Sequence, residues 1–379
     1  MTRLAAVILA AGLSSRLGEF KPLAGLGGET LLARATLLFR EAGVAEVLAV
    51  AGHHASQTMA EAARLGITAI TNETYAGGMF TSVLAGLRAL ADAGGAPDAV
   101  FVLPVDIPLV RPHTLRLLRE RLASTQAAVL HPVFAGKRGH PPLIAGRFVP
   151  EILAWNGSSG LRGALLALEE RHGAAEIPVA DENIHFDVDT QTDLDEARQR
   201  FARRTIPTPQ EALALLDLHN AGERGHAHAR GVADAALALA RALNAQGAQL
   251  DLALTEPAAL LHDIAKGQPR HEAAGAALLD GLGFGGAARI VAAHRDIAPH
   301  DAPRITEREL VYFADKLVQG GSRVPVAARF QQKLDLFAQD AEATTAIRHR
   351  LANALAMQAR IEAATNAPLH ALVPGTEDT

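Results

Sequence analysis

The sequence predicts two domains of different class, an α/β domain with a doubly wound sheet followed by an all-α domain. Short β-rich runs alternate with amphipathic helical stretches up to about residue 203, a pattern typical of parallel βαβ units. A polar, proline-containing segment follows, and beyond it helical periodicity continues without a convincing strand. We therefore expect an α/β domain over 1–203, a linker over 204–212, a helical domain over 213–365 and a flexible tail over 366–379.

Composition limits the classes of protein to consider. With 379 residues, of which 49% are hydrophobic, the chain is long enough to build two cores. The formal net charge of −5 argues against a general nucleic-acid binder, which needs a basic face. The chain has no cysteine, which excludes disulfides and thiolate metal sites and fits a reducing compartment. No apolar run reaches the roughly 18 residues of a membrane span, so we expect a cytoplasmic protein without a membrane partner.

In the first half, each predicted strand is a short apolar run and each predicted helix carries an apolar stripe. The predicted strands are 4–9, 46–51, 67–71, 99–103, 127–130 and 184–188. The predicted helices are 30–42, 55–65, 80–91, 111–122, 161–171 and 192–203. Their alternation predicts parallel strands whose carboxyl ends meet at one edge of the sheet.

In the second half, Thr208-Pro209-Gln210-Glu211 predicts a helix start, with Thr208 as the cap and Glu211 closing a capping box. Helical periodicity then predicts further helices. The predicted helices are 209–218, 228–245, 256–263, 271–282, 287–293, 306–317 and 338–363.

The loop after the first strand contains small residues and two cations, Arg16 and Lys21. Backbone N–H groups in such a loop can approach phosphate oxygens closely, and the cations can neutralise a triphosphate. The loop resembles the Leu-x-x-Gly-x-Ser-x-Arg-x-Gly-x-x-Lys loop of nucleotidyltransferases, most closely the MobA/MocA-like molybdenum cofactor group. The resemblance implies a Rossmann-like nucleotidyltransferase. The nucleotide-binding residues it implies are Leu9, Ala10, Ala11, Gly12, Ser14, Ser15, Arg16 and Lys21.

Two acidic motifs follow predicted strands. Asp106, in Leu-Pro-Val-Asp-Ile-Pro, matches the family's metal-binding aspartate, and a carboxylate there suits Mg²⁺. Asp187-Val188-Asp189-Thr190, followed by Asp193-Leu194, resembles the acidic ending of these domains and makes Asp189 the candidate second ligand. The alternative is an acidic cluster that only caps a helix, where the dipole favours negative charge; we expect that role for Asp187 and Asp193.

Two further motifs concern the substrates. The stretch 78–87 resembles the family's Gly-Met-x-x-Ser-Leu-x-x-Gly-Leu segment, and Ser82 within it either contacts the nucleotide or caps and packs a helix. The stretch 136–142 resembles the Gly-x-x-Gly-His-Pro segment of cytidylyl-type members. Arg138 and His140 in that segment either meet an anionic acceptor or belong to a structural loop.

These motifs together imply that an acceptor phosphate attacks the α-phosphorus of a nucleoside triphosphate, with Arg16, Lys21 and Asp106 as the catalytic residues. By resemblance, Leu-Ala-Ala-Gly favours CTP as the nucleotide and a molybdopterin-like acceptor, and the expected receiver of the product is a molybdoenzyme. One alternative is another acceptor, such as a sugar or alcohol phosphate. Another is a non-catalytic carrier of a nucleotide-bearing cofactor.

The second half carries histidines and aspartates in a known order. His228, the pair His262-Asp263, and Asp315 resemble the metal ligands of HD-domain phosphohydrolases, over about 215–335. Imidazole and carboxylate suit a divalent transition metal such as Mn²⁺ or Fe²⁺. The resemblance makes His271 and His294 candidates for a second metal and Lys266 a candidate phosphate contact. The alternative is an inactive domain that serves only for docking.

Overall fold

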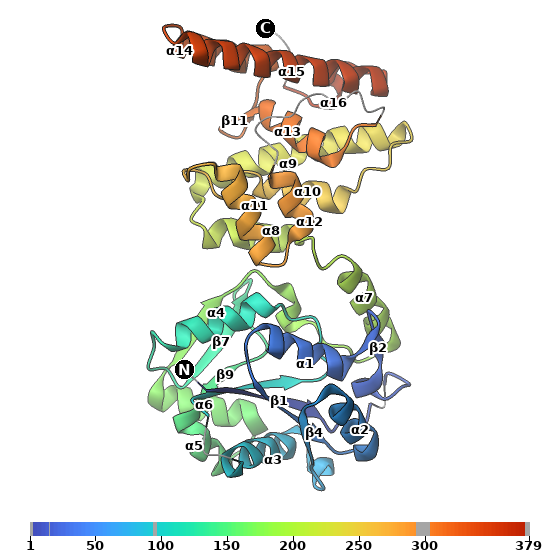
Figure 1. Cartoon of the computed structure of the whole chain (residues 1–379), viewed down its shortest axis with the longest axis vertical. Helices are drawn as coiled ribbons and strands as arrows, with labels where there is room; N and C mark the ends of the chain where they lie inside the picture. Colours follow the sequence, from blue (N-terminus) through green and yellow to red (C-terminus); the bar gives the residue numbers. More distant parts are fainter. Residues whose placement is uncertain (1–2, 15, 94–96, 293–303, 376–379) are drawn as a thin grey trace. The chain divides into compact units, whose positions relative to one another are not determined.

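The computed structural model describes residues 3–14, 16–93, 97–292 and 304–375. The chain forms two compact units, Met1–Arg203 and Arg204–Thr379, and Figure 1 shows a sheet-containing unit and a helical one. Within the described residues, no helix is long and apolar enough to cross a membrane.

The first unit is built on one mixed sheet. Its strand order is β10-β7-β9-β6-β1-β4-β5, with β8 paired to β7. The strands are β1 (Leu4–Ala10), β4 (Glu46–Ala51), β5 (Thr68–Thr71), β6 (Ala99–Pro104), β7 (Val129–Phe134), β8 (Lys137–Arg138), β9 (Leu143–Ala145) and β10 (Ala174–Pro178). β9 runs antiparallel to β6 and β7, and the β1–β4, β1–β6, β4–β5 and β7–β10 pairs are parallel. Every residue of β1 is buried, as expected for a parallel strand covered on both faces.

Helices cover both faces of this sheet (Figure 1). The helices are α1 (Leu31–Glu41), α2 (Ala55–Leu65), α3 (Met79–Asp92), α4 (Pro112–Leu122), α5 (Val149–Leu153), α6 (Gly160–His172) and α7 (Gln191–Ala202). α3, α5 and α6 pack one apolar core against β1, β4, β6 and β7. On the other face Phe39 of α1 lies 5.8 Å from Phe101 of β6, measured between ring centroids. Gly86 lets α3 approach β1, because a Cβ there would lie 2.5 Å from Cγ1 of Val7.

The fold prediction for this unit was wrong at one strand. Residues 184–188 form no strand; Glu182–His185 is a 3₁₀ helix, and Val188 N–H donates to the Asp106 carbonyl at 2.7 Å. The edge position of the sheet belongs instead to β10, which the sequence analysis did not predict. The short β9 and the ribbon of β2 (Gly25–Leu26) with β3 (Glu29–Thr30) were also missed.

The second unit is helical, as predicted, and its first helix begins with the predicted capping box of Thr208 and Glu211. The helices are α8 (Pro209–Leu218), α9 (Gly222–Ala245), α10 (Leu252–Leu261), α11 (His271–Gly281), α12 (Gly285–Val291), α13 (Glu307–Lys316), α14 (Val326–Leu336), α15 (Ala341–Thr365) and α16 (Leu369–Leu372). Most match the predicted ranges within a few residues, whereas α14 was not predicted.

Three local expectations for the second unit differ from the structure. A two-residue ribbon, β11 (Val318–Gln319) with β12 (Ser322–Arg323), interrupts the helical pattern. The expected linker 204–212 already contains the first turn of α8, whose Ala212 is fully buried. The expected flexible tail contains α16, and Leu369 and Val373 are buried there because they pack against the helical core.

Candidate functional site

The first site lies where β1, β6 and the loop before α7 end. Lys21, in the 3₁₀ turn Lys21–Leu23, places its Nζ 3.1 Å from Asp106 Oδ2 and 2.5 Å from Asp189 Oδ1. Arg16, which is largely exposed, reaches Asp189 Oδ2 at 2.6 Å. The structure therefore brings together the four residues that the sequence analysis singled out in three separate motifs.

Local hydrogen bonds hold these side chains in place. Ser14 has a left-handed backbone (φ 54°), and its Oγ accepts from the Lys21 N–H at 3.0 Å. Asp193 accepts from the N–H groups of Asp189 (3.1 Å) and Thr190 (2.7 Å), and it closes a capping box with Thr190 at the start of α7. Asp193 is thus a helix-capping residue in this structure, the role expected for it.

Electrostatics at this site favour a charged lysine. Burial opposes the ammonium charge of Lys21, but hydrogen bonds and charges from Asp189 and Asp106 outweigh it and raise the pKa. The hydrogen bonds that Asp193 receives from the hydroxyl and N–H of Thr190 lower the pKa of its carboxyl. At neutral pH the site therefore holds a lysine cation between two aspartates.

The remaining nucleotide-loop candidates have different surroundings. Leu9, Ala10 and Ala11 are buried at the end of β1, whereas Gly12 is exposed in the following loop. Ser15 lies outside the described residues. Ser82 is buried in α3, and its hydroxyl accepts from Asn72 Nδ2 at 3.0 Å, which links α3 to the chain after β5. A contact of Ser82 with nucleotide stays a prediction.

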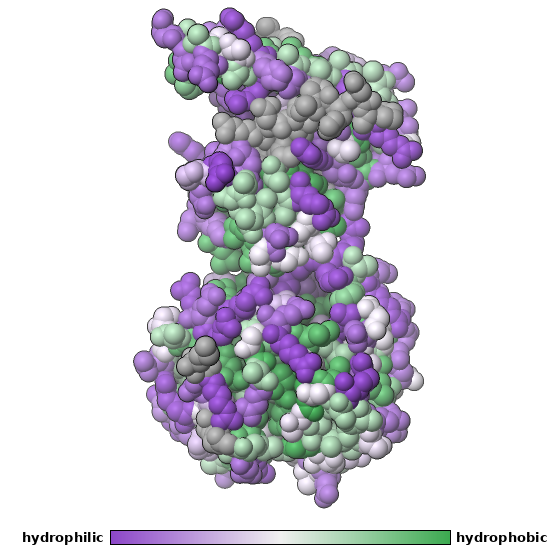
Figure 2. Space-filling model, in the orientation of Figure 1, coloured by the Kyte–Doolittle hydropathy of each residue, from purple (hydrophilic) through white to green (hydrophobic). Residues whose placement is uncertain are grey.

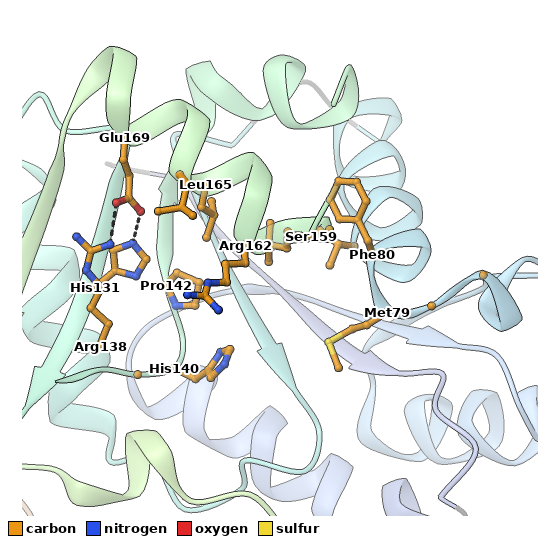
Figure 3. A pocket seen from close by; sticks show the side chains of 17 residues that line it. Met79, Phe80, His131, Arg138, His140, Pro142, Ser159, Arg162, Leu165 and Glu169 are labelled. Atoms are coloured by element: carbon orange, nitrogen blue, oxygen red, sulfur yellow. Dashed lines mark hydrogen bonds and ion pairs between the residues drawn. The ribbon is translucent and has the colours of Figure 1, made fainter. Parts of the chain in front are cut away.

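The first unit also contains a cavity of about 800 Å³ (Figure 3). Its walls are mainly apolar and come from α3 and α6, and the predicted acceptor residues Arg138 and His140 both line it. Other residues that line the cavity include Met79, Phe80, His131, Arg162, Leu165 and Glu169. Arg138 is held by Glu169 and Glu176, at 2.7 Å each, and Glu169 also contacts His131 Nε2 at 2.8 Å.

The histidines of the cavity are kept neutral. Burial is the main cause that lowers the pKa of His140, and the charge of Asp106 in the first site partly opposes it. Burial also lowers the pKa of His131 against the raising effect of Glu169. Sequence reasoning missed His131, Glu169 and Arg162, because no motif marks them; Arg162 has no ion-pair partner among the residues described.

The second site is a cluster of histidine and aspartate side chains within the helical unit. His228 Nε2 of α9 lies 3.3 Å from Asp315 Oδ1 of α13, and His262 Nε2 lies 3.7 Å from that same oxygen. Each of the residues His228, His262 and Asp315 offers one ligand atom. These three atoms lie within 4.8 Å of one another, close enough to bind a single metal ion. Asp263 Oδ2 lies 4.0 Å from His228 Nε2 and 3.7 Å from His262 Nε2.

Hydrogen bonding and nearby charges fix the chemical state of two side chains in the second site, His262 and Asp315. The Ala259 carbonyl accepts from His262 Nδ1 at 2.7 Å, so in the neutral ring Nε2 carries the lone pair that a metal requires. Burial opposes the charge of the Asp315 carboxylate, yet Lys316, His228, Arg329 and His262 together hold its pKa well below the usual range. The donor set of imidazole nitrogens and ionised carboxylate fits a divalent transition metal.

The remaining candidates for this site are His271, His294 and Lys266. His271 Nε2 lies 3.5 Å from Asp263 Oδ1, at the edge of the cluster. His294 lies outside the described residues. Lys266 Nζ contacts Asp263 Oδ2 at 2.6 Å while most of its side chain is exposed. Lys266 is therefore placed at the cluster, on the solvent side of Asp263.

Comparison with known families found one matching family model in each half of the chain. Residues 6–173 match the MobA-like NTP transferase domain, and residues 225–319 match the HD domain. The chain joins a MobA-like NTP transferase domain to an HD domain. The first match includes Arg16, Lys21 and Asp106, and the second includes the whole His228, His262, Asp263 and Asp315 set.

Relatives of the transferase domain include enzymes of cofactor synthesis. The molybdenum cofactor cytidylyltransferase of Escherichia coli is 27% identical over 205 residues, which is 53% of this chain and 98% of that protein. A probable molybdenum cofactor guanylyltransferase of Opitutus terrae is 34% identical over 127 residues, 34% of this chain and 59% of that protein. A solved nucleotidyl transferase from Methanothermobacter is 22% identical with a TM-score of 0.46, covering 54% of this chain and 100% of that one.

Proposed function

We propose that the MobA-like domain transfers a nucleoside monophosphate, from CTP in preference, to a phosphorylated acceptor of the molybdopterin type. We also propose that the HD domain hydrolyses a phosphoester. One observation carries the first proposal: Asp106 and Asp189 converge on one lysine at the edge of the sheet, in a unit that also holds the cavity lined by His140. A molybdoenzyme that receives the product stays a prediction.

The converging carboxylates fit Mg²⁺, which prefers oxygen ligands. Bound by Asp106 and Asp189, Mg²⁺ would neutralise charge on the triphosphate. Lys21 and Arg16 would exchange their carboxylate contacts for contacts with phosphate oxygens of the triphosphate. Because the acceptor phosphate is already ionised near pH 7, these residues need only bind and orient the two substrates.

The reaction then balances without a further reactant. An acceptor phosphate oxygen forms a bond to the α-phosphorus, the bond from that phosphorus to the oxygen bridging to the β-phosphate breaks, and pyrophosphate leaves. The apolar cavity supports an acceptor with a sizeable apolar or ring-containing body, since a cavity of about 800 Å³ exceeds the needs of a very small phosphoester.

The test is pyrophosphate release with Mg²⁺, molybdopterin and each of CTP, GTP, ATP and UTP. We expect release with CTP, and its loss in Asp106→Ala but not in the matched control Asp92→Ala, an exposed aspartate at the end of α3. Release with another nucleotide, or only with a sugar or alcohol phosphate as acceptor, would favour the corresponding alternative. Tight cofactor binding without turnover, unchanged in Asp106→Ala, would favour the carrier.

For the HD domain, the grouping of His228, His262 and Asp315 around one point supports an enzyme over a docking module. A divalent ion held there would activate water for attack on a phosphoester. The protein's own part is to hold the His262 imidazole in one tautomer, keep Asp315 ionised, and offer Lys266 to a substrate phosphate.

A further inference from the structure

Positive charge exceeds negative charge around the HD centre. Asp263 is contacted by Lys266, and Asp315 is contacted by both Lys316 (2.8 Å) and Arg329 (3.3 Å). Lys333 follows Arg329 by one helical turn on α14. Among the residues described, three cations contact the two carboxylates, Lys333 adds a fourth cation nearby, and Glu272, 3.7 Å from His271 Nε2, adds one further carboxylate. The divalent ion for which the site is suited would add two more positive charges.

Two of these cations lie outside the part of the chain that matches the HD family. Arg329 and Lys333 belong to α14, which begins after residue 319, the end of the match. Arg329 donates to the Asp315 carboxylate and to the carbonyl groups of Asp315 and Val318. Residues four apart share a helix face, so Lys333 lies on the face of α14 that is turned toward the metal site.

Lys333 is a cation crowded by other cations. Its Nζ lies 5.8 Å from the centroid of the Phe330 ring, and no carboxylate pairs with it in the described part of the chain. Burial of the ammonium group, followed by the charges of Arg329 and Lys316, lowers its pKa, and Asp315 opposes this only in part. The residue as a whole is exposed. An anion bound from solvent would relieve this repulsion.

We propose that the HD centre binds a ligand with at least two adjacent phosphate groups, and that Lys333 binds one of them. A single phosphate monoester carries a charge of about −2, which is less than the excess positive charge of the metal-loaded site. A diphosphate or triphosphate supplies more negative charge than a monoester, and the cations available to it come from two segments of the chain, Lys266 beside Asp263 and Lys333 on α14. The inference rests on the proposed phosphohydrolase function of this domain.

This ligand chemistry matches what the transferase domain handles. The proposed transfer starts from a nucleoside triphosphate and releases pyrophosphate, and both contain a P–O–P bridge. Hydrolysis would add one water across that bridge: the water oxygen bonds to one phosphorus, the bridging P–O bond breaks, and the proton released by the water passes to the leaving phosphate oxygen or to solvent according to pH. A reaction that releases pyrophosphate is therefore a suitable source of the substrate.

The experiment measures binding without turnover. The full-length Lys21→Gln variant, which weakens the transferase site, is loaded with Mn²⁺, and binding of labelled pyrophosphate, inorganic phosphate or CTP is measured at 4 °C within a time shorter than turnover. We expect pyrophosphate to bind at least about tenfold more tightly than inorganic phosphate, and Lys333→Gln to remove about tenfold of that affinity. Lys333→Arg should retain the affinity. The control Arg241→Gln, an exposed cation near the end of α9, should not change it.

The outcomes separate this inference from the proposed function. Pyrophosphate binding no tighter than phosphate binding, or unchanged by Lys333→Gln, would overturn the inference even if the metal-loaded protein hydrolyses monoesters. Polyphosphate binding that depends on Lys333, without hydrolysis of any ester tested, would support the inference and refute the hydrolase. Comparable affinity for CTP and pyrophosphate would identify the P–O–P unit as the shared ligand, and preference for either would identify the source.

Discussion

Replacing Lys21 with methionine tests whether Asp106 and Asp189 form a metal site. The side chains of Lys21, Asp106 and Asp189 are 13%, 22% and 24% exposed, so their contacts are largely but not fully buried. Removing one partner from a buried ion pair costs about 3–5 kcal/mol, whereas an exposed pair contributes less than about 1 kcal/mol. Asp189 retains Arg16, and Asp106 loses its cation. We therefore expect a loss of about 2 kcal/mol.

A loss of this size is measurable in the first unit alone. The single tryptophan of the chain, Trp155, lies in that unit, so its fluorescence reports on unfolding there. For a unit of this length about 2 kcal/mol corresponds to a fall in Tm of about 4–8 °C. The control Lys137→Met removes an exposed lysine of the same unit and should leave Tm within about 1 °C, since surface substitutions change stability little.

Magnesium ion then distinguishes a metal site from a structural ion pair. In Lys21→Met the two carboxylates converge without their shared cation, so Mg²⁺ should bind them more tightly and raise Tm more than in the wild type. Pyrophosphate release should still be largely lost, because Lys21 no longer reaches the triphosphate. Equal shifts of Tm by Mg²⁺ in the variant and the wild type would refute the assignment of Asp106 and Asp189 as metal ligands.

Three further substitutions test the second metal site, the packing of α3 on the sheet, and the titration of His140. The double variant His262→Ala, Asp263→Ala should lose the metal measured by elemental analysis while retaining pyrophosphate release; unchanged metal content would show that the second site is wrong. Gly86→Ala should lower the unfolding free energy in urea by about 1–3 kcal/mol, because its Cβ meets Val7, whereas Gly25→Ala has open space. Burial lowers the pKa of His140, so its contribution to stability is present above the unfolded pKa of about 6.5 and is lost as pH falls below it. His140→Phe should therefore weaken the dependence of unfolding free energy on pH between about 7.5 and 5.5, and an unchanged slope would exclude His140 as a cause.

Sequence reasoning succeeded where the determining contacts are local. The apolar run of β1 and the capping box of Thr208 and Glu211 each depend on neighbouring residues, and both form as predicted. The site motifs follow a further regularity, since the carboxyl ends of parallel strands meet at one edge. The ends of β1 and β6 meet there, which is why Lys21 and Asp106 come into contact.

The errors have long-range causes. Residues 184–188 alternate like a strand, but the segment before them is anchored by Asp181, which accepts from Arg111 N–H at 2.8 Å and Thr114 Oγ1 at 2.7 Å. The edge of the sheet is formed instead by β10, whose sequence Ala-Ala-Glu-Ile-Pro contains only one β-branched residue and therefore does not predict a strand. The cavity was equally hidden, because His131 and Glu169 meet across 38 residues of chain. No pattern within a window of local sequence contains such a contact.

Both sites place positive side chains against the carboxylates that would hold a metal ion. Lys21 contacts Asp106 and Asp189 in the transferase domain, and Lys316 and Arg329 contact Asp315 in the HD domain. A metal ion arriving alone must compete with these cations for the same oxygens. A phosphate ligand supplies an alternative partner for the cations, and so it removes the competition. Metal ion and phosphate should therefore strengthen each other's binding in each domain, which ties occupation of the site by metal to the presence of substrate.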